Sequence, residues 1–156
     1  MNQQQVAKSS SKVLMCPSAE PEMEGSVIFG IVAGTYEQPQ LVHLRETKQI
    51  PAELLALDSP VKPTEIFRIA ANCDEKCGHF DGSKCRLSQR IVEGLPAVSE
   101  VLQPCPIRAT CRWWNQEGKE ACFRCLQIVR DNPNASQELF AAGDPSVYQS
   151  QSAKVA

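Results

Sequence analysis

Four cysteines lie close together in the segment CPIRATCRWWNQEGKEACFRC, which spans residues 105 to 125. They are Cys105, Cys111, Cys122 and Cys125, in the pattern C-x5-C-x10-C-x2-C. Residues three apart on a helix share a face, with Cβ atoms about 5–6 Å apart, so the last two thiols can point into one site. In a reducing compartment, thiols at this density indicate metal ligands before they indicate disulfides. The segment therefore predicts a metal site.

The spacing favours an iron–sulfur cluster over zinc as the bound group. Structural zinc sites draw their ligands from tight C-x2–4-C pairs, a pattern that Cys122 and Cys125 match and the wider Cys105–Cys111 pair does not. A [4Fe-4S] cluster is held by four thiolates and tolerates wider spacing. We expect one or two [4Fe-4S] clusters, with zinc as the alternative.

A second group of cysteines precedes the first in CDEKCGHFDGSKC, residues 73 to 85. Cys73, Cys77 and Cys85 have His79 among them, and three cysteines with one histidine can form a zinc site without help. Alternatively Cys16 supplies the fourth thiolate, which divides the eight cysteines of the chain into two sets of four. Mixed sets drawn from both groups also remain open at this point.

Catalytic interpretations of these residues are weaker than metal binding. His79 near Cys77, with Asp81 to orient the imidazole, has the residue types of a nucleophile–base pair. Such triads are assembled in space, however, and proximity along the chain is poor evidence for one. Cys122 and Cys125 in CFRC do not follow a strand, as a thioredoxin-like motif requires. We therefore expect the chain not to be an enzyme in its own right.

The apolar patterns of the first half predict strands that deliver the second group of cysteines. SVIFGIVAG (26–34) and QLVHLRE (40–46) predict a hairpin, and Pro51 followed by AELLAL predicts a short helix. TEIFRIAA (64–71) alternates and predicts a third strand, which ends just before Cys73.

Helical patterns dominate the second half. KCRLSQRIVEGLP (84–96) and EACFRCLQIVRD (120–131) both predict helices, with irregular chain rich in Pro and Gly between them. A further short helix is expected at SQELFAA, with Ser136 as its N-cap and Gly143 past its end. Short helices joined by irregular loops bury little apolar surface, which is a second reason to expect that metal organises this half.

These patterns predict an α+β fold in which a small N-terminal β-hairpin and strand unit packs with an irregular, short-helix, cysteine-rich half. We expect a flexible segment at 1–24, a single metal-binding domain at 25–131 divided into parts 25–72 and 73–131, and a flexible tail at 132–156. The N-terminus lacks a secretory signal pattern, and no apolar run is long enough for a membrane span, so we expect a cytoplasmic protein without a membrane partner.

The expected function is electron transfer, redox sensing or an accessory role beside a larger enzyme, which makes a protein the expected partner. The alternative is a zinc-stabilised interaction module. Its surface would consist of basic and aromatic residues of the first cysteine segment: Arg108, Arg112, Trp113, Trp114, Lys119 and Arg124. Interleaved basic and aromatic residues can also bind nucleic acid, but the formal net charge of −2 makes that partner less favoured.

Overall fold

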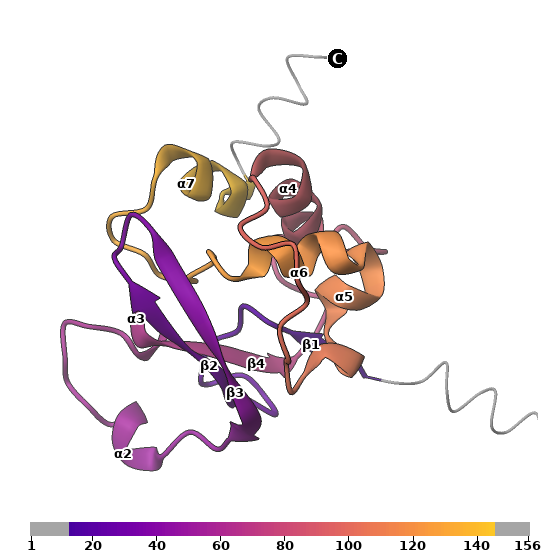
Figure 1. Ribbon diagram of the computed structural model, residues 1–156. Helices are drawn as coiled ribbons and strands as arrows, with labels where there is room; N and C mark the ends of the chain where they lie inside the picture. The colour runs from indigo at the N-terminus through magenta and orange to yellow at the C-terminus, as the bar shows by residue number, and fades with distance from the viewer. Residues whose placement is uncertain (1–12, 146–156) are drawn as a thin grey trace, which may run out of the picture.

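A four-stranded antiparallel sheet and a group of short helices form the fold of the computed structural model, which describes residues 13–145 (Figure 1). The strands, in the spatial order β1-β4-β2-β3, are β1 (Met15–Cys16), β4 (Phe67–Asn72), β2 (Val27–Gly34) and β3 (Pro39–Lys48). The helices are α2 (Ala52–Leu55), α3 (Pro63–Ile66), α4 (Arg86–Gly94), the 3-10 turn η1 (Arg108–Thr110), α5 (Arg112–Glu117), α6 (Lys119–Cys125) and α7 (Gln137–Gly143). The predicted α+β class is confirmed.

The strands of the first half lie where the apolar alternation predicts them. β2 and β3 form the expected hairpin, and β4 pairs with β2 on its other side. The segment 64–71 differs at its start, because Pro63 opens the one-turn helix α3 and the strand begins only at Phe67. β4 ends at Asn72, so Cys73 directly follows the sheet as expected.

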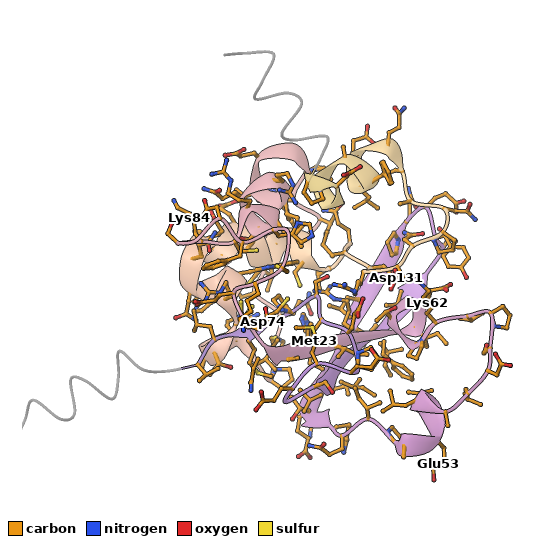
Figure 2. The ribbon with its side chains drawn as sticks, turned by 180° about the vertical axis from the view of Figure 1, so that it is seen from behind. Met23, Glu53, Lys62, Asp74, Lys84 and Asp131 are labelled. Atoms are coloured by element: carbon orange, nitrogen blue, oxygen red, sulfur yellow. The ribbon has the colours of Figure 1, made fainter. Side chains whose placement is uncertain are left out.

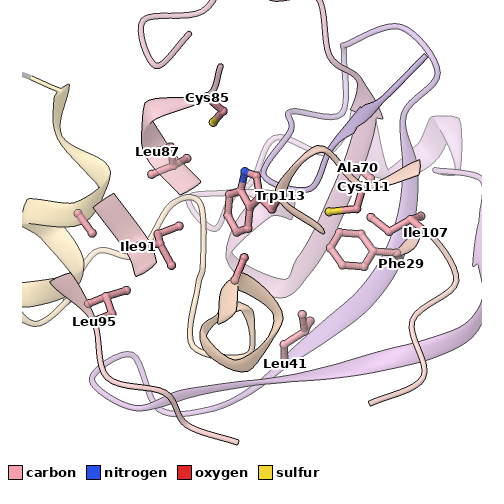
Figure 3. Packing of buried hydrophobic residues seen from close by; sticks show 12 residues of the cluster. Phe29, Leu41, Ala70, Cys85, Leu87, Ile91, Leu95, Ile107, Cys111 and Trp113 are labelled. Atoms are coloured by element: carbon pink, nitrogen blue, oxygen red, sulfur yellow. The ribbon is translucent and has the colours of Figure 1, made fainter. Parts of the chain in front are cut away.

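Side chains from one face of the sheet form the main core with the helices. Phe29 and Ala70 from the sheet pack in one buried cluster with Ile91 of α4 and Trp113 of α5 (Figure 3). Figure 1 shows α4, α5, α6 and α7 gathered on one side of the sheet. The α4 side chains reach this cluster because the apolar residues of that helix recur at helical spacing, as predicted.

The opposite face of the sheet is covered by the segment that precedes β2. Ala19 packs with Ile28, Ile69 and Ala71, and Met23, labelled in Figure 2, lies against this second cluster. Residues 13–24 therefore differ from the flexible segment that their polar composition predicts. Backbone pairing explains the difference, because β1 adds to the edge of β4 and the Ala19 N–H donates to the Ile69 carbonyl at 2.9 Å.

The helical half contains one helix that the sequence pattern did not predict. α5 begins at Arg112 within the stretch expected to be irregular, and Gly118, with φ of +75°, separates it from α6. α6 ends at Cys125 and not near residue 131, because the chain leaves the helix toward the sheet. α7 forms where predicted, with the Ser136 hydroxyl accepting from the Leu139 N–H, but Gly143 is its last residue and does not lie past its end.

Burial predicts which apolar side chains hold this fold together. Ile91 is 1% exposed at the centre of the main core, and Leu57 is 65% exposed in a loop. Ile91→Ala should reduce the free energy of unfolding by about 2–5 kcal/mol, since it leaves a cavity between α4 and the sheet. The control Leu57→Ala should change it by less than about 0.5 kcal/mol. Urea unfolding followed by circular dichroism measures both, and equal losses would contradict this packing.

Candidate metal centre

The four cysteines of residues 105–125 line a single cavity. Cys105, Cys111, Cys122 and Cys125 surround a space of about 20 Å³, whose other walls include aromatic side chains, Pro17 and His43. This volume is close to what one water molecule requires. The cavity brings together all four residues that the sequence predicts to bind metal in this segment.

Three short elements position these thiols. Cys105 precedes η1, Cys111 joins η1 to α5, and α6 carries Cys122 in its middle and Cys125 as its last residue. Cys111 is buried, whereas the other three are half-buried. All eight cysteines of the chain are free thiols in the structure.

Arg68 of β4 is buried against this cavity and is 1% exposed. Its Nη2 donates to the Cys125 Sγ at 3.3 Å and to the Pro17 carbonyl at 2.8 Å. Its Nη1 donates to the carbonyls of Cys125 and Ile128 at 2.8 and 2.9 Å. These last two bonds hold the chain where it leaves α6, which explains why the helix stops at Cys125.

The charge of Arg68 has no acidic partner, because within residues 13–145 no carboxylate forms an ion pair with it. The rings of Phe29 and Trp113 flank the guanidinium, with centroids 5.2 and 5.8 Å from Cζ. A buried cation without an anion is costly unless hydrogen bonds and aromatic faces compensate it. These hydrogen bonds and rings compensate the buried guanidinium, which places a positive charge beside the cavity.

Burial keeps most of these thiols protonated at neutral pH. It raises the pKa of Cys111 to about 12 and also raises the pKa values of Cys105 and Cys122. Arg108 opposes the effect at Cys122, because its positive charge favours the thiolate and so lowers the pKa. Metal ligation by such thiols releases protons, so binding strengthens as the pH rises.

Cys16 is held by backbone pairing next to the chain that leads into the second group of cysteines. The β1–β4 register places Cys16 opposite Ala71, and the Cys73 N–H donates to the Leu14 carbonyl at 2.9 Å. Burial raises the pKa of Cys16 to about 11, and the neighbouring thiols of Cys85, Cys73 and Cys77 raise it further. Cys16 therefore lies beside the second group of cysteines and does not line the cavity of the first group.

His79 is held apart from both sets. Its Nδ1 accepts a hydrogen bond from Nη2 of Arg90 at 2.6 Å, since a guanidinium has no acceptor. The imidazole lines a different cavity, between α4 and α7, which no cysteine borders. Asp81 does not contact His79 but accepts from Ser83, Lys84 and Arg86, so the catalytic arrangement considered from sequence is not formed.

The basic and aromatic residues of the first segment do not form one exposed face. Trp113 is 2% exposed in the core, and Trp114 is half-buried with Arg108 over its ring. Arg112 pairs with Glu75 at 2.6 Å, and Arg124 pairs with Glu120 at 2.8 Å. Arg112 thus joins α5 to the loop that carries Glu75, whereas the Arg124 pair lies within α6.

Two residues beside the cavity, Arg68 and His43, were missed by the sequence analysis. Arg68 interrupts an otherwise apolar strand, which is a signal for a buried charge with a special role. His43 lies two residues after the buried Leu41 on β3. Gly30 of β2 pairs with His43 on one side and with Arg68 on the other. A Cβ at Gly30 would meet Leu41 Cδ1 at 2.4 Å, so a larger residue there would displace the Leu41 side chain.

No group of three or more His, Cys, Asp or Glu side chains within residues 13–145 is placed to hold a single metal ion. Over the same residues, no helix is long and apolar enough to cross a membrane. No protein-family model, curated protein or solved structure matches the chain.

Both histidines of the chain are held neutral, which predicts the pH dependence of stability. Burial, with nearby arginines, lowers the pKa values of His43 and His79 to about 4. In the unfolded chain each titrates near pH 6.5, so between these values the unfolded state binds more protons. Stability is therefore lost as the pH falls from about 6.5 to about 4.

The variant His43→Gln/His79→Gln should flatten this dependence, because glutamine does not titrate. Urea midpoints of the metal-free, reduced protein, measured across this pH range, test it. An unchanged slope in the double variant would contradict the assignment of the two half-buried neutral imidazoles.

Proposed function

We propose that the protein binds a [4Fe-4S] cluster through Cys105, Cys111, Cys122 and Cys125 and serves as a one-electron carrier. The observation that carries the proposal is the cavity that these four thiols share beside the buried, carboxylate-free guanidinium of Arg68. A cluster with four thiolate ligands is anionic, so it would supply the countercharge that Arg68 lacks within residues 13–145.

The arrangement of the thiols supports a cluster over a single zinc ion. Four zinc-bound sulfurs must all lie about 2.3 Å from one point, which suits the close Cys122–Cys125 pair and not the wider Cys105–Cys111 pair. A cubane is wider than the cavity, so loading requires the half-buried side chains of Cys105, Cys122 and Cys125 to turn outward. Such rotations move the side chains between staggered rotamers.

The surroundings of the cavity support electron transfer as the role of the cluster. Phe29, Trp113 and Trp114 line it and limit the access of water, which is one of the factors that set a reduction potential. Four protein ligands leave no iron open for a substrate. A reducing compartment such as the cytoplasm keeps the thiols free for ligation, and we expect the electron partner to be a protein.

Removal of one thiol tests the ligand set. Cys122→Ala should lose the iron and sulfide of one cubane, about four of each per chain. Lys119→Ala, an exposed change on the same helix, should retain both. Anaerobic reconstitution followed by iron and sulfide analysis and a visible spectrum measures the loss. A Cys122→Ala protein with the full content, or a wild type that takes up only zinc, would overturn the proposal.

The charge of Arg68 should tune the cluster. A unit charge about 5 Å away is worth about 3 kcal/mol at an effective dielectric constant of about 20. Arg68→Met should therefore lower the midpoint potential by on the order of 100 mV, since about 59 mV corresponds to a tenfold change for one electron. Arg68→Lys should shift it less, and the exposed Arg45→Met should leave it unchanged. Potentiometric titration measures these midpoint potentials. Equal potentials in Arg68→Met and wild type would contradict a cluster beside Arg68.

A further inference from the structure

Cys16 and Cys73 share one face at the edge of the sheet. In the antiparallel β1–β4 pair, Cys16 lies opposite Ala71, and Cys73 is two residues beyond Ala71 on the same side. Residues in this diagonal relation lie about 7–8 Å apart, within reach of one polynuclear group. The short strand β1 thus has a structural role that its position in a polar segment did not indicate.

The loop between β4 and α4 brings the other two thiols back to the same place. Asp81 accepts from the N–H groups of Ser83 and Lys84, and Phe80 forms an antiparallel bridge with Cys85. The Phe80 N–H also donates to the Cys77 carbonyl at 3.2 Å. This tight turn reverses the chain between Cys77 and Cys85. Figure 2 labels Asp74 and Lys84 at the two sides of this loop.

Shared backbone contacts tie this group to the first centre. Met15, beside Cys16, forms a parallel bridge with Cys111, and such strands lie about 4.8 Å apart. Pro17, on the other side of Cys16, lines the first cavity and accepts from Arg68. Gln116 of α5 accepts from the Cys85 N–H and donates to the Cys85 carbonyl, both at 2.8 Å.

We propose that Cys16, Cys73, Cys77 and Cys85 bind a second [4Fe-4S] cluster adjacent to the first. The assignment of these four ligands does not depend on the first cluster. Electron exchange between the two clusters, in contrast, rests on the proposed function. In that exchange one electron leaves a reduced cluster and reduces its neighbour, and no bond forms or breaks. A protein with two such centres can hold two electrons.

The test uses the full chain, reconstituted anaerobically with ferrous iron and sulfide. The wild type should hold about eight irons and eight sulfides. Cys77→Ala should hold about half of each, while Lys76→Ala, a neighbouring change in the same exposed loop, should hold all of them. Cys77 is exposed, so its removal leaves the core intact, and Cys16→Ala provides the same comparison from β1.

The Cys122→Ala protein separates this proposal from the first. Loss of iron in Cys122→Ala but not in Cys77→Ala or Cys16→Ala would overturn the second cluster and leave the first. Loss in Cys77→Ala alone would support the second cluster and overturn the first. Zinc in place of iron, lost on Cys77→Ala, would also overturn the second cluster.

Electron paramagnetic resonance of the dithionite-reduced protein adds a readout of distance. Two adjacent reduced clusters should give a spin-coupled spectrum in the wild type and a simple single-cluster spectrum in Cys77→Ala. A wild-type spectrum identical in shape to that of Cys77→Ala would overturn the adjacency of the clusters.

Discussion

The buried guanidinium of Arg68 is the interaction on which the rest of the structure depends. The guanidinium extends from the apolar strand β4. It donates to the carbonyl of Pro17, which follows β1, and to the carbonyls of Cys125 and Ile128 at the end of α6. A buried charge satisfied in this way is destabilising if its partners are removed, so the three segments are held in one arrangement. The same side chain therefore organises the fold and places positive charge beside a cavity lined by thiols.

Several features follow from this constraint. α6 ends where its carbonyls turn to Arg68, and β1 is held against β4 by the residue that follows Cys16. Phe29 and Trp113 pack on the guanidinium and also wall the cavity. A single cationic side chain thus connects the sheet, the aromatic residues, Cys125 of the first group and the Pro17 carbonyl next to Cys16.

The sequence allowed prediction of elements whose signal is local. The β2–β3 hairpin, β4, α4 and α7 all have alternation, helical spacing or a cap in their own residues. β1 and α5 were missed because tertiary contacts determine them: β1 exists through pairing with β4, and α5 is fixed by Trp113 in the core and Gln116 on Cys85. The division of the cysteines was open for the same reason, since only the register of β1 brings Cys16 to the second group. The sequence does show Arg68 as a charged residue within an apolar strand, but it does not show which groups surround that charge.

The central claim is that the thiols bind iron–sulfur clusters. The most direct measurement is a visible spectrum of the full chain purified without oxygen, with iron, sulfide and zinc determined on the same sample. The account predicts a brown protein with iron and sulfide in equal amounts, about eight of each per chain. A colourless protein, with zinc alone or with no metal, would contradict it.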